Sequence, residues 1–376
     1  MNFFKRLRLH TRLLLRSKFV LISLILLLNL GLLLGIQIYR DPAFPGSLIS
    51  SAAYEFGLHK HGPYYNDNVD DLKRYTFMGL LTLPTSEHDV YFNATRVLVY
   101  KLKHHPETKS KYPVHVLVMK GVDEWKIERL RLDGAEIIMV DQIKTEDLIE
   151  SGLSIGMGSY RYQYMFTKLS VFEQTQFDKV CILDSDLLVL KNMDDIFDTP
   201  YVYESPAEPD MFSFPIFKKP DDEEDYQFSD NFDAYGAPRS EFYPYLLGAC
   251  DDRNPGHATP PEESETFNAG LMLVHPSSLH MHRIKKIARY PYMYDDARMM
   301  EQSLLNLAYN KYGWFPWTRL DFSYNGVWVT EEDLPYLRAA HGKFWEYDNT
   351  EFPQILTAEW HKAFGELLAF HDYVVE

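Results

Sequence analysis

Two aspartates, Asp184 and Asp186, lie two residues apart directly after an apolar run, within residues 178–198 (DKVCILDSDLLVLKNMDDIFD). Side chains at positions i and i+2 of an extended chain point to the same side, so both carboxylates can converge on one hard cation. The apolar residues on both sides of the pair are typical of a strand buried on both faces, where ionised carboxylates are costly unless something pairs with them. The pattern therefore predicts a divalent cation site at the end of a buried strand.

Asp-x-Asp is a short pattern, and its ordinary alternatives are a turn or a solvated strand end. An EF-hand loop beginning at Asp184 is excluded, because the sixth position would need glycine and holds Val189, and the twelfth would need glutamate and holds Asp195. A phosphatase-type Asp-x-Asp would continue with small residues such as Gly-Thr, whereas Leu187 and Leu188 follow here. The cation site is the interpretation that agrees best with the flanking residues.

Strand-like and helix-like stretches alternate around the aspartates. Apolar patterns predict strands at 76–83, 113–119, 136–140, 179–183 and 267–275, and helices at 90–105, 123–132, 276–290, 295–309 and 356–370. This alternation is typical of an α/β fold with a mostly parallel sheet flanked by helices. Ligands of such sheets bind beyond the carboxyl ends of the strands, which is where strand 179–183 delivers the aspartates.

The N-terminal region predicts a membrane anchor. Residues 1–18 hold six Lys or Arg and no acidic side chain, and residues 19–39 form a 21-residue run without a charge, long enough to cross a bilayer as a helix. A cleaved signal peptide is the alternative, but its apolar region would span about 7–15 residues before a small-residue cleavage site. We interpret 19–39 as a signal-anchor transmembrane helix, with a cytoplasmic tail (1–18) and the rest of the chain on the far side of the membrane.

The remainder of the chain is acidic. Its composition predicts a stem at 40–73, a single large domain at 74–376, and an acidic insert at 204–266 that is either a functional loop or a disordered segment. The net charge of the 376-residue chain is -16 despite the basic tail, so no nucleic-acid partner is expected. Cys181 and Cys250 allow at most one disulfide, and their pairing is left open, as is glycosylation of the Asn93-Ala94-Thr95 sequon.

The order of these segments resembles the glycogenin-like glycosyltransferases, family 8 of the retaining nucleotide-sugar-dependent enzymes, over roughly residues 76–345. The block 167–197 is similar to that family's helix, strand and Asp-x-Asp in sequence, and Phe267-Asn268-Ala269-Gly270 is similar to its Phe-Asn-Ser/Ala-Gly strand. The resemblance implies a GT-A-type nucleotide-binding fold forming one catalytic domain after the anchor.

The resemblance also implies roles for individual residues. Asp184, Asp186 and His341 would be the metal ligands, and two carboxylates with one imidazole suit Mn²⁺, with Mg²⁺ possible. The residues that would bind the UDP-sugar nucleotide and diphosphate are Leu81, Thr82, Leu83, Tyr91, Arg161, Lys168, Ser185, Gly270, Gly342 and Lys343. The residues that would act at the donor sugar are Lys168, Asn268, Glu301 and Gln302.

Three departures from the family pattern bear on these roles. The loop before Tyr91 is two residues longer than usual, so Tyr91 could instead be a core aromatic residue. Glu301-Gln302 stands where the family has Asp-Gln, and Lys343 follows His341 more closely than usual. Arg161 and Lys168 could be solvated helix charges, and His341 an ordinary core or surface histidine.

The resemblance implies a metal-dependent hexosyltransferase that moves a sugar from a UDP-sugar to a hydroxyl of a glycan, glycolipid or glycoprotein acceptor, with retention at the anomeric carbon. With the anchor, it predicts a single-pass type II Golgi membrane protein with a lumenal catalytic domain. An inverting Asp-x-Asp transferase and a catalytically silent lumenal glycan-binding or scaffold protein are the alternatives. The presence of Asp184, Asp186 and His341 favours an enzyme over a silent protein; the donated sugar and the acceptor are not predicted.

Overall fold

The structure of the chain, a computed structural model, describes residues that all follow the predicted stem. They are residues 74–84, 89–148, 164–202, 244–289, 299–313, 315–348 and 350–374. The chain divides into two compact units, Met1–Asp67 and Asn68–Glu376, and the described residues belong to the second. The predicted tail, anchor (19–39) and stem, together with Arg161 and residues 203–243, lie outside them. No helix among the described residues is long and apolar enough to cross a bilayer.

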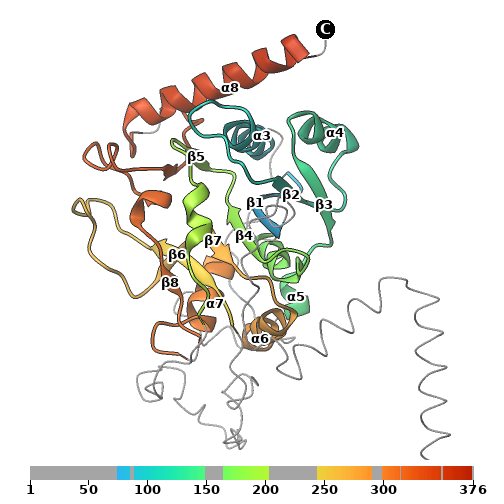
Figure 1. Cartoon of the computed structure of the whole chain (residues 1–376), viewed down its shortest axis with the longest axis vertical. Coiled ribbons are helices and arrows are strands. Elements are labelled where there is room, and N and C mark those ends of the chain that lie inside the picture. Colours follow the sequence, from blue (N-terminus) through green and yellow to red (C-terminus); the bar gives the residue numbers. More distant parts are fainter. Residues whose placement is uncertain are drawn as a thin grey trace, which may run out of the picture. The chain divides into compact units, whose positions relative to one another are not determined.

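A seven-stranded sheet forms the centre of the described domain (Figure 1). Its strands are β1 (Tyr75–Leu81), β2 (Val114–Met119), β3 (Glu136–Val140), β4 (Lys179–Leu183), β6 (Leu247–Asp251), β7 (Phe267–Val274) and β8 (Thr318–Arg319). In the order β3-β2-β1-β4-β7-β6-β8, the first four strands are parallel, β7 is antiparallel to both of its neighbours, and β8 is parallel to β6. The predicted α/β fold with a mostly parallel sheet is confirmed.

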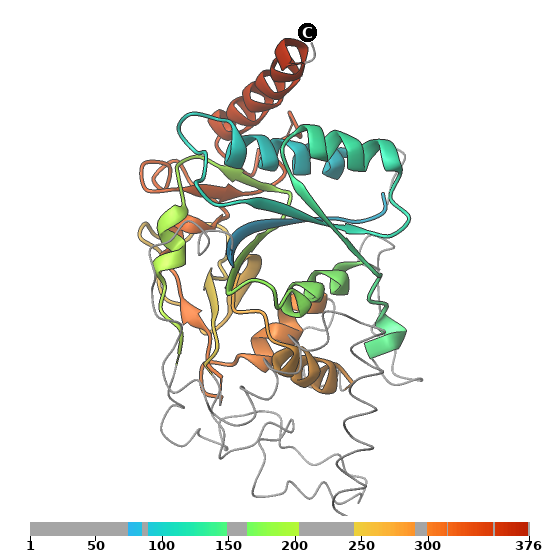
Figure 2. The same ribbon diagram turned by 45° about the vertical axis from the view of Figure 1, so that its right-hand side comes forward.

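Helices cover both faces of this sheet (Figure 2). Those on one face are α3 (Val90–Lys103) and α4 (Glu124–Leu132); those on the other are the 3₁₀ helix η3 (Met165–Glu173), α5 (Thr145–Leu148), α6 (Ser278–Ala288) and α7 (Met300–Ala308). Every residue of β2 and β4 is buried as a result. This is why both strands are apolar over nearly their whole length rather than alternating with polar residues.

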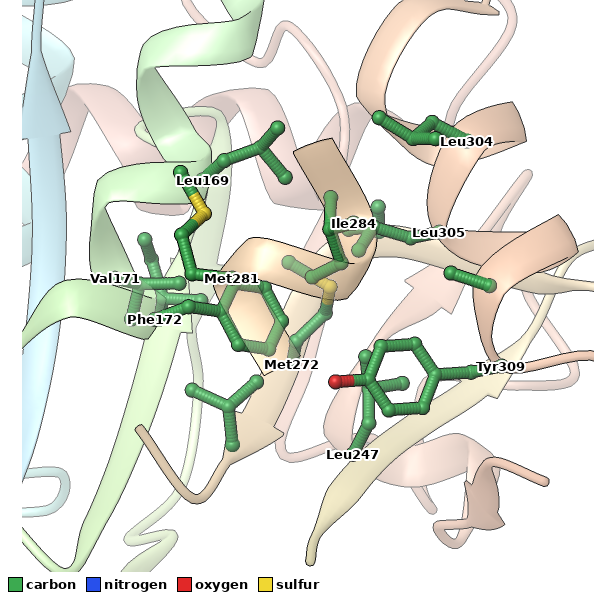
Figure 3. Packing of buried hydrophobic residues seen from close by; sticks show 14 of the residues in the cluster. Leu169, Val171, Phe172, Leu247, Met272, Met281, Ile284, Leu304, Leu305 and Tyr309 are labelled. Atoms are coloured by element: carbon green, nitrogen blue, oxygen red, sulfur yellow. The ribbon is translucent and has the colours of Figure 1, made fainter. Parts of the chain in front are cut away.

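The core under the second face fixes the helix that precedes the aspartates (Figure 3). Leu169 and Phe172 of η3 pack in one buried cluster with Met281 and Ile284 of α6, and the cluster continues to β6, β7 and α7 through Leu247, Met272, Leu304, Leu305 and Tyr309. Burying one such side chain contributes roughly 1.5–3 kcal/mol. Helix η3 is therefore held firmly against the sheet, next to the end of β4.

A second, three-stranded sheet continues from the aspartates. It consists of β5 (Leu187–Val189), β10 (Ala339–His341) and β9 (Gly326–Val327), in the order β5-β10-β9. The antiparallel pairing of β5 with β10 places His341 opposite Leu187, one residue after Asp186. The C-terminal helix α8 (Gln354–Val374) packs behind this sheet and against α3, in a cluster that includes Leu188, Ala340 and Trp360. The small sheet thus brings β10, from the C-terminal part of the domain, next to the aspartates.

One feature differs from the sequence-based expectations, and one question that the sequence left open is answered. The range 204–266, predicted as an insert with little periodicity, includes strand β6, which pairs with β7 and β8. Cys181 and Cys250 are free thiols. They lie on β4 and β6, which are separated by β7, and two strand spacings place their Cα atoms at least ~9 Å apart, beyond the reach of a disulfide.

Candidate functional site

The backbone of the Asp184-Ser185-Asp186 segment is held from both sides. The amide of Asp184 donates a hydrogen bond to the carbonyl of Gly270 on β7 (2.8 Å), and the amide of Gly342 donates to the carbonyl of Asp186 (3.0 Å). The segment therefore links the end of β4 to β5 while it is fixed to β7 and to the end of β10. Its position agrees with the expected ligand site beyond the carboxyl end of a parallel strand.

The structure brings the three predicted metal ligands together. One ligand atom from each of Asp184, Asp186 and His341 can be chosen so that all lie within 4.8 Å of one another. The Nε2 atom of His341 is 3.2 Å from Oδ1 of Asp186. Each of the three side chains is partly exposed, Asp184 by 26%, Asp186 by 19% and His341 by 16%.

The three side chains titrate as one electrostatic group. Burial raises the pKa of Asp184, and the attraction of Lys168 offsets this only in part. Burial also acts to raise the pKa of Asp186, but the charge and hydrogen bond of His341 outweigh it, so the pKa is lowered. Burial favours the neutral His341 ring, yet Asp186 and Asp184 raise the pKa of His341 overall. The imidazolium form thus compensates the two carboxylates, and a bound divalent cation would take over that role, because metal binding displaces the ligands' protons.

Gly270 is required by the position of the His341 ring. A Cβ atom on Gly270 would lie 2.1 Å from Cε1 and 2.4 Å from Nδ1 of His341, and 2.8 Å from Oδ1 of Asn268. The pairing of β6 with β7 shifts register between Ala249 and Cys250, opposite this part of β7. Such irregularities re-aim side chains next to functional sites. Glycine here allows β7 to approach the ring closely.

Lys168 is buried beneath Asp184. Its Nζ atom lies 2.5 Å from Oδ1 of Asp184, 2.5 Å from the carbonyl oxygen of Ala269 and 4.0 Å from Oε1 of Glu301, and its side chain is 1% exposed. The sequence-based expectation was a contact with the diphosphate or the donor sugar. The ammonium group of Lys168 compensates and orients the Asp184 carboxylate, and its contact with a donor stays a prediction.

Glu301 lies behind Lys168. Its side chain is almost fully buried, and this burial raises the pKa of Glu301 to about 7, although the nearby Lys168 charge opposes the shift. The carboxylate, predicted to contact the donor sugar, therefore faces the Lys168 ammonium group in the interior. Near neutral pH it can exist in either protonation state.

Asn268 and Gln302 form a hydrogen-bonded group with Asp252 and Asn325, neither of which was predicted. Oδ1 of Asn268 accepts from the amide of Gly270 (2.9 Å) and from Nδ2 of Asn325 (3.0 Å). Nδ2 of Asn268 and Nε2 of Gln302 donate to Oδ1 and Oδ2 of Asp252, at 3.3 and 3.0 Å. Asp252 was missed because it falls within the predicted insert. The apolar run 245–249 that precedes Asp251-Asp252 is the signal that could have revealed both the strand and the carboxylate.

Ser185 is connected to α3 through Thr95, another residue that was not predicted. The Ser185 and Thr95 hydroxyls are 2.8 Å apart, and Ser185 also donates to the carbonyl of Leu80 (3.3 Å). Thr95 is fully buried and donates to the carbonyl of Tyr91 (2.8 Å). The hydroxyl predicted to face the ribose is thus engaged between α3 and β1. The Asn93-Ala94-Thr95 sequon lies near the start of α3, and whether it is glycosylated stays open.

The other predicted nucleotide-binding residues lie around these elements. Leu81 ends β1 and is buried, and Thr82 and Leu83 follow it half-buried. The ring of Tyr91 packs edge-on against Trp345, with the centroids 5.3 Å apart. Gly342 faces Phe352, whose ring would lie 2.8 Å from an added Cβ, and Lys343 next to it is half-buried. Of this group, Gly342 makes a direct contact with the metal-ligand segment, through its hydrogen bond to Asp186.

Comparison with known proteins identifies relatives by sequence. The chain is 54% identical over 312 residues to an uncharacterised protein of Schizosaccharomyces pombe, which covers 82% of this chain and 84% of the relative. It is 31% identical over 144 residues to human glycogenin-1, covering 38% of this chain and 39% of glycogenin-1. It is 25% identical over 264 residues to galactinol synthase 5 of Arabidopsis thaliana, covering 65% and 68%. No protein-family model matches the chain.

A search of solved structures finds similar folds at low identity. The galactosyltransferase LgtC, in complex with donor and acceptor sugar analogues, aligns with a TM-score of 0.48 at 18% identity, covering 77% of this chain and 95% of LgtC. The S. pombe relative is the strongest of these matches, because it combines high identity with coverage of most of both chains. The chain therefore belongs to the same family as the S. pombe protein, and it has weaker sequence similarity to glycogenin-1 and galactinol synthase 5.

Proposed function

We propose that the protein is a metal-dependent glycosyltransferase that transfers a hexose from a UDP-sugar to a hydroxyl group of a glycan, glycolipid or glycoprotein, with retention of configuration. The observation that carries this proposal is the convergence of Asp184, Asp186 and His341 at the carboxyl end of β4. The sequence similarity to glycogenin-1 and galactinol synthase supports the sugar-transfer chemistry.

The donor set fits a divalent cation that binds a diphosphate. Two carboxylate oxygens and one imidazole nitrogen are few enough protein ligands to leave positions for phosphate oxygens. An imidazole among them favours Mn²⁺ over a dedicated Ca²⁺ site, and Mg²⁺ is the other cation that such oxygen-rich sites bind. The raised pKa of His341 shows that the carboxylates attract a positive charge, which the cation would supply.

In the proposed reaction, some residues would bind the metal and the diphosphate, and others would orient the donor sugar. When bound, the cation would neutralise the negative charge that develops on the departing diphosphate. Lys168 stabilises the charged form of Asp184, while the amides of Asn268 and Gln302 are placed to orient the donor sugar. Lys343, two residues after His341 and half-buried, would supply a positive charge to the phosphates.

We propose further that residues 19–39 anchor the protein in the Golgi membrane with the catalytic domain in the lumen. The uncharged 21-residue run and its basic N-terminal flank support this orientation.

Tagged full-length protein should then stay in the membrane pellet after alkaline carbonate extraction, and a C-terminal tag should resist protease until detergent opens the vesicles. Release by carbonate, or cleavage of the C-terminal tag in intact vesicles, would contradict the anchor or its orientation.

Removing the metal or one ligand should abolish activity. Purified full-length protein is expected to release UDP from at least one of a panel of UDP-sugars, to lose this activity in EDTA and to regain it with Mn²⁺. Asp186→Asn, which keeps the shape but removes the charge, should lower the rate by about 10²-fold or more. The control Asp141→Asn removes an exposed carboxylate that pairs with Lys120 and should leave the rate unchanged. If no donor reacts, or if Asp186→Asn is as active as the wild type, the enzyme proposal fails and the silent glycan-binding alternative is favoured.

Adding one methyl group at Gly270 should weaken metal binding. The Cβ atom of Gly270→Ala would overlap the His341 ring, so the imidazole must move away from Asp186. The Mn²⁺ concentration needed for half-maximal UDP release should rise by about 10–100-fold, the range typical of changes to residues that orient a metal ligand. Gly79→Ala in β1 is the matched control, since its Cβ would lie 3.7 Å or more from its neighbours. Equal Mn²⁺ dependence of Gly270→Ala and the wild type would show that the ring is not a ligand.

The buried Glu301 should make the stability of the protein depend on pH. Its pKa in the folded state is raised to about 7 from the ordinary 4.5, so the stability linked to its protonated form is present below about pH 4.5 and is lost as the pH rises through 7. In metal-free buffer, Glu301→Gln should exceed the wild type in free energy of unfolding by about 2–3 kcal/mol at pH 8, and by less than about 1 kcal/mol at pH 5. Urea denaturation at both pH values measures this, with the exposed Glu128→Gln as the control. A difference that does not change with pH would contradict the raised pKa of Glu301.

A further inference from the structure

Asp252 is a carboxylate to which the proposed function assigns no role. It follows the last residue of β6 and is half-buried. Each of its carboxylate oxygens accepts a hydrogen bond from a different side-chain amide, Oδ1 from Asn268 and Oδ2 from Gln302. These two amides come from β7 and α7, so Asp252 joins three elements at one point.

The backbone fixes the direction in which both amides point. Oε1 of Gln302 accepts from the amide of Ala269 (3.0 Å), and Oδ1 of Asn268 accepts from the amide of Gly270 (2.9 Å). Turning either side chain over would set an NH₂ group against a backbone N–H and an oxygen against the Asp252 carboxylate. Both NH₂ groups are therefore held toward Asp252.

This arrangement offers alternating donors and acceptors. Each NH₂ group has two hydrogens and gives one to Asp252. Oδ1 of Asp252 also accepts from the backbone amide of Arg253 (3.1 Å), whereas Oδ2 keeps a further lone pair. A pair of neighbouring sugar hydroxyls, each of which can donate and accept, matches such a surface. A sugar carboxylate can only accept, and it would bring a second negative charge next to Asp252.

The neighbouring cations do not compensate for such a charge. Nε of Arg319 lies 3.0 Å from Oδ1 of Asp251, and Arg253 contacts Asp251 (3.4 Å) and donates to the carbonyl of Glu262 (2.5 Å). Lys168 is engaged with Asp184 and Ala269. Over the described part of the chain, no ion pair to Asp252 is present.

We propose that Asp252 is a specificity-determining positioning residue. Together with the backbone it holds the amides of Asn268 and Gln302 so that their free hydrogens face the hydroxyls of an uncharged hexose, and its charge disfavours UDP-sugars whose hexose carries a carboxylate. This inference rests on the proposed function and adds the class of donor to it. The inference depends on one arrangement: two side-chain amides donate to the same half-buried carboxylate, and the backbone fixes the orientation of both amides.

The test compares matched donors with the full-length protein in detergent and saturating Mn²⁺. UDP release is measured for UDP-glucose against UDP-glucuronate and for UDP-galactose against UDP-galacturonate, giving kcat and KM for each. For the better pair, the wild type should show a kcat/KM at least about tenfold higher for the uncharged hexose. Asp252→Asn should lower that kcat/KM while preserving or raising the value for the uronate, so that the ratio falls by about tenfold or more.

Two comparisons separate a role in selection from a role in folding. Glu263→Gln removes an exposed charge that pairs with Arg319 and should keep the wild-type ratio. If Asp252→Asn lowers the activity on both members of a pair by the same factor, Asp252 is merely structural and the inference is overturned. A wild type that prefers the uronate also overturns it while the proposed function stands. If no UDP-sugar reacts, the proposed function fails and the inference falls with it.

Discussion

Two carboxylates at the end of a buried strand are the constraint on which this domain depends. Asp184 and Asp186 follow β4, all of whose residues are buried, and charged groups in such a place need compensation. Lys168, which lies before them on η3, compensates the charge of Asp184. His341 lies far along the chain, and the pairing of β5 with β10 brings it next to Asp186. Fold and site are therefore coupled, because the same contacts that stabilise the aspartates assemble a set of ligands for a divalent cation.

The rigidity of the site follows from its surroundings. Helix η3 carries Lys168 on one side and packs Leu169 and Phe172 into the core with α6 on the other, so the ammonium group has little freedom to move. Gly270 lets β7 approach the His341 ring more closely than any other residue would. A donor bound between the aspartates and the Asn268–Gln302 amides would thus meet groups already in place, which lowers the entropic cost of orienting it.

Much of the fold could be predicted from the sequence, because strands covered on both faces appear as continuous apolar runs. The same pattern indicated that Asp184 and Asp186 end such a strand. The partners of these residues were harder to predict, because they depend on long-range pairing. The contact of Lys168 with Asp184 and the inward direction of Glu301 are set by packing that no local pattern contains. Asp252 and β6 were missed because an acidic, aperiodic stretch precedes them. The position of His341 was predicted from the resemblance of its motif, and the β5–β10 register gives the physical reason.

We propose above all that Asp184, Asp186 and His341 together hold a divalent cation that binds the diphosphate of a nucleotide sugar. Anomalous diffraction at the manganese edge, from crystals grown with Mn²⁺ and UDP, tests it most directly. We expect a strong anomalous peak for a Mn²⁺ ion that is bound by a carboxylate oxygen of each aspartate and by a ring nitrogen of His341. The UDP phosphates should complete the coordination of this ion. A peak elsewhere in the domain, or UDP bound without a metal between these three residues, would contradict it.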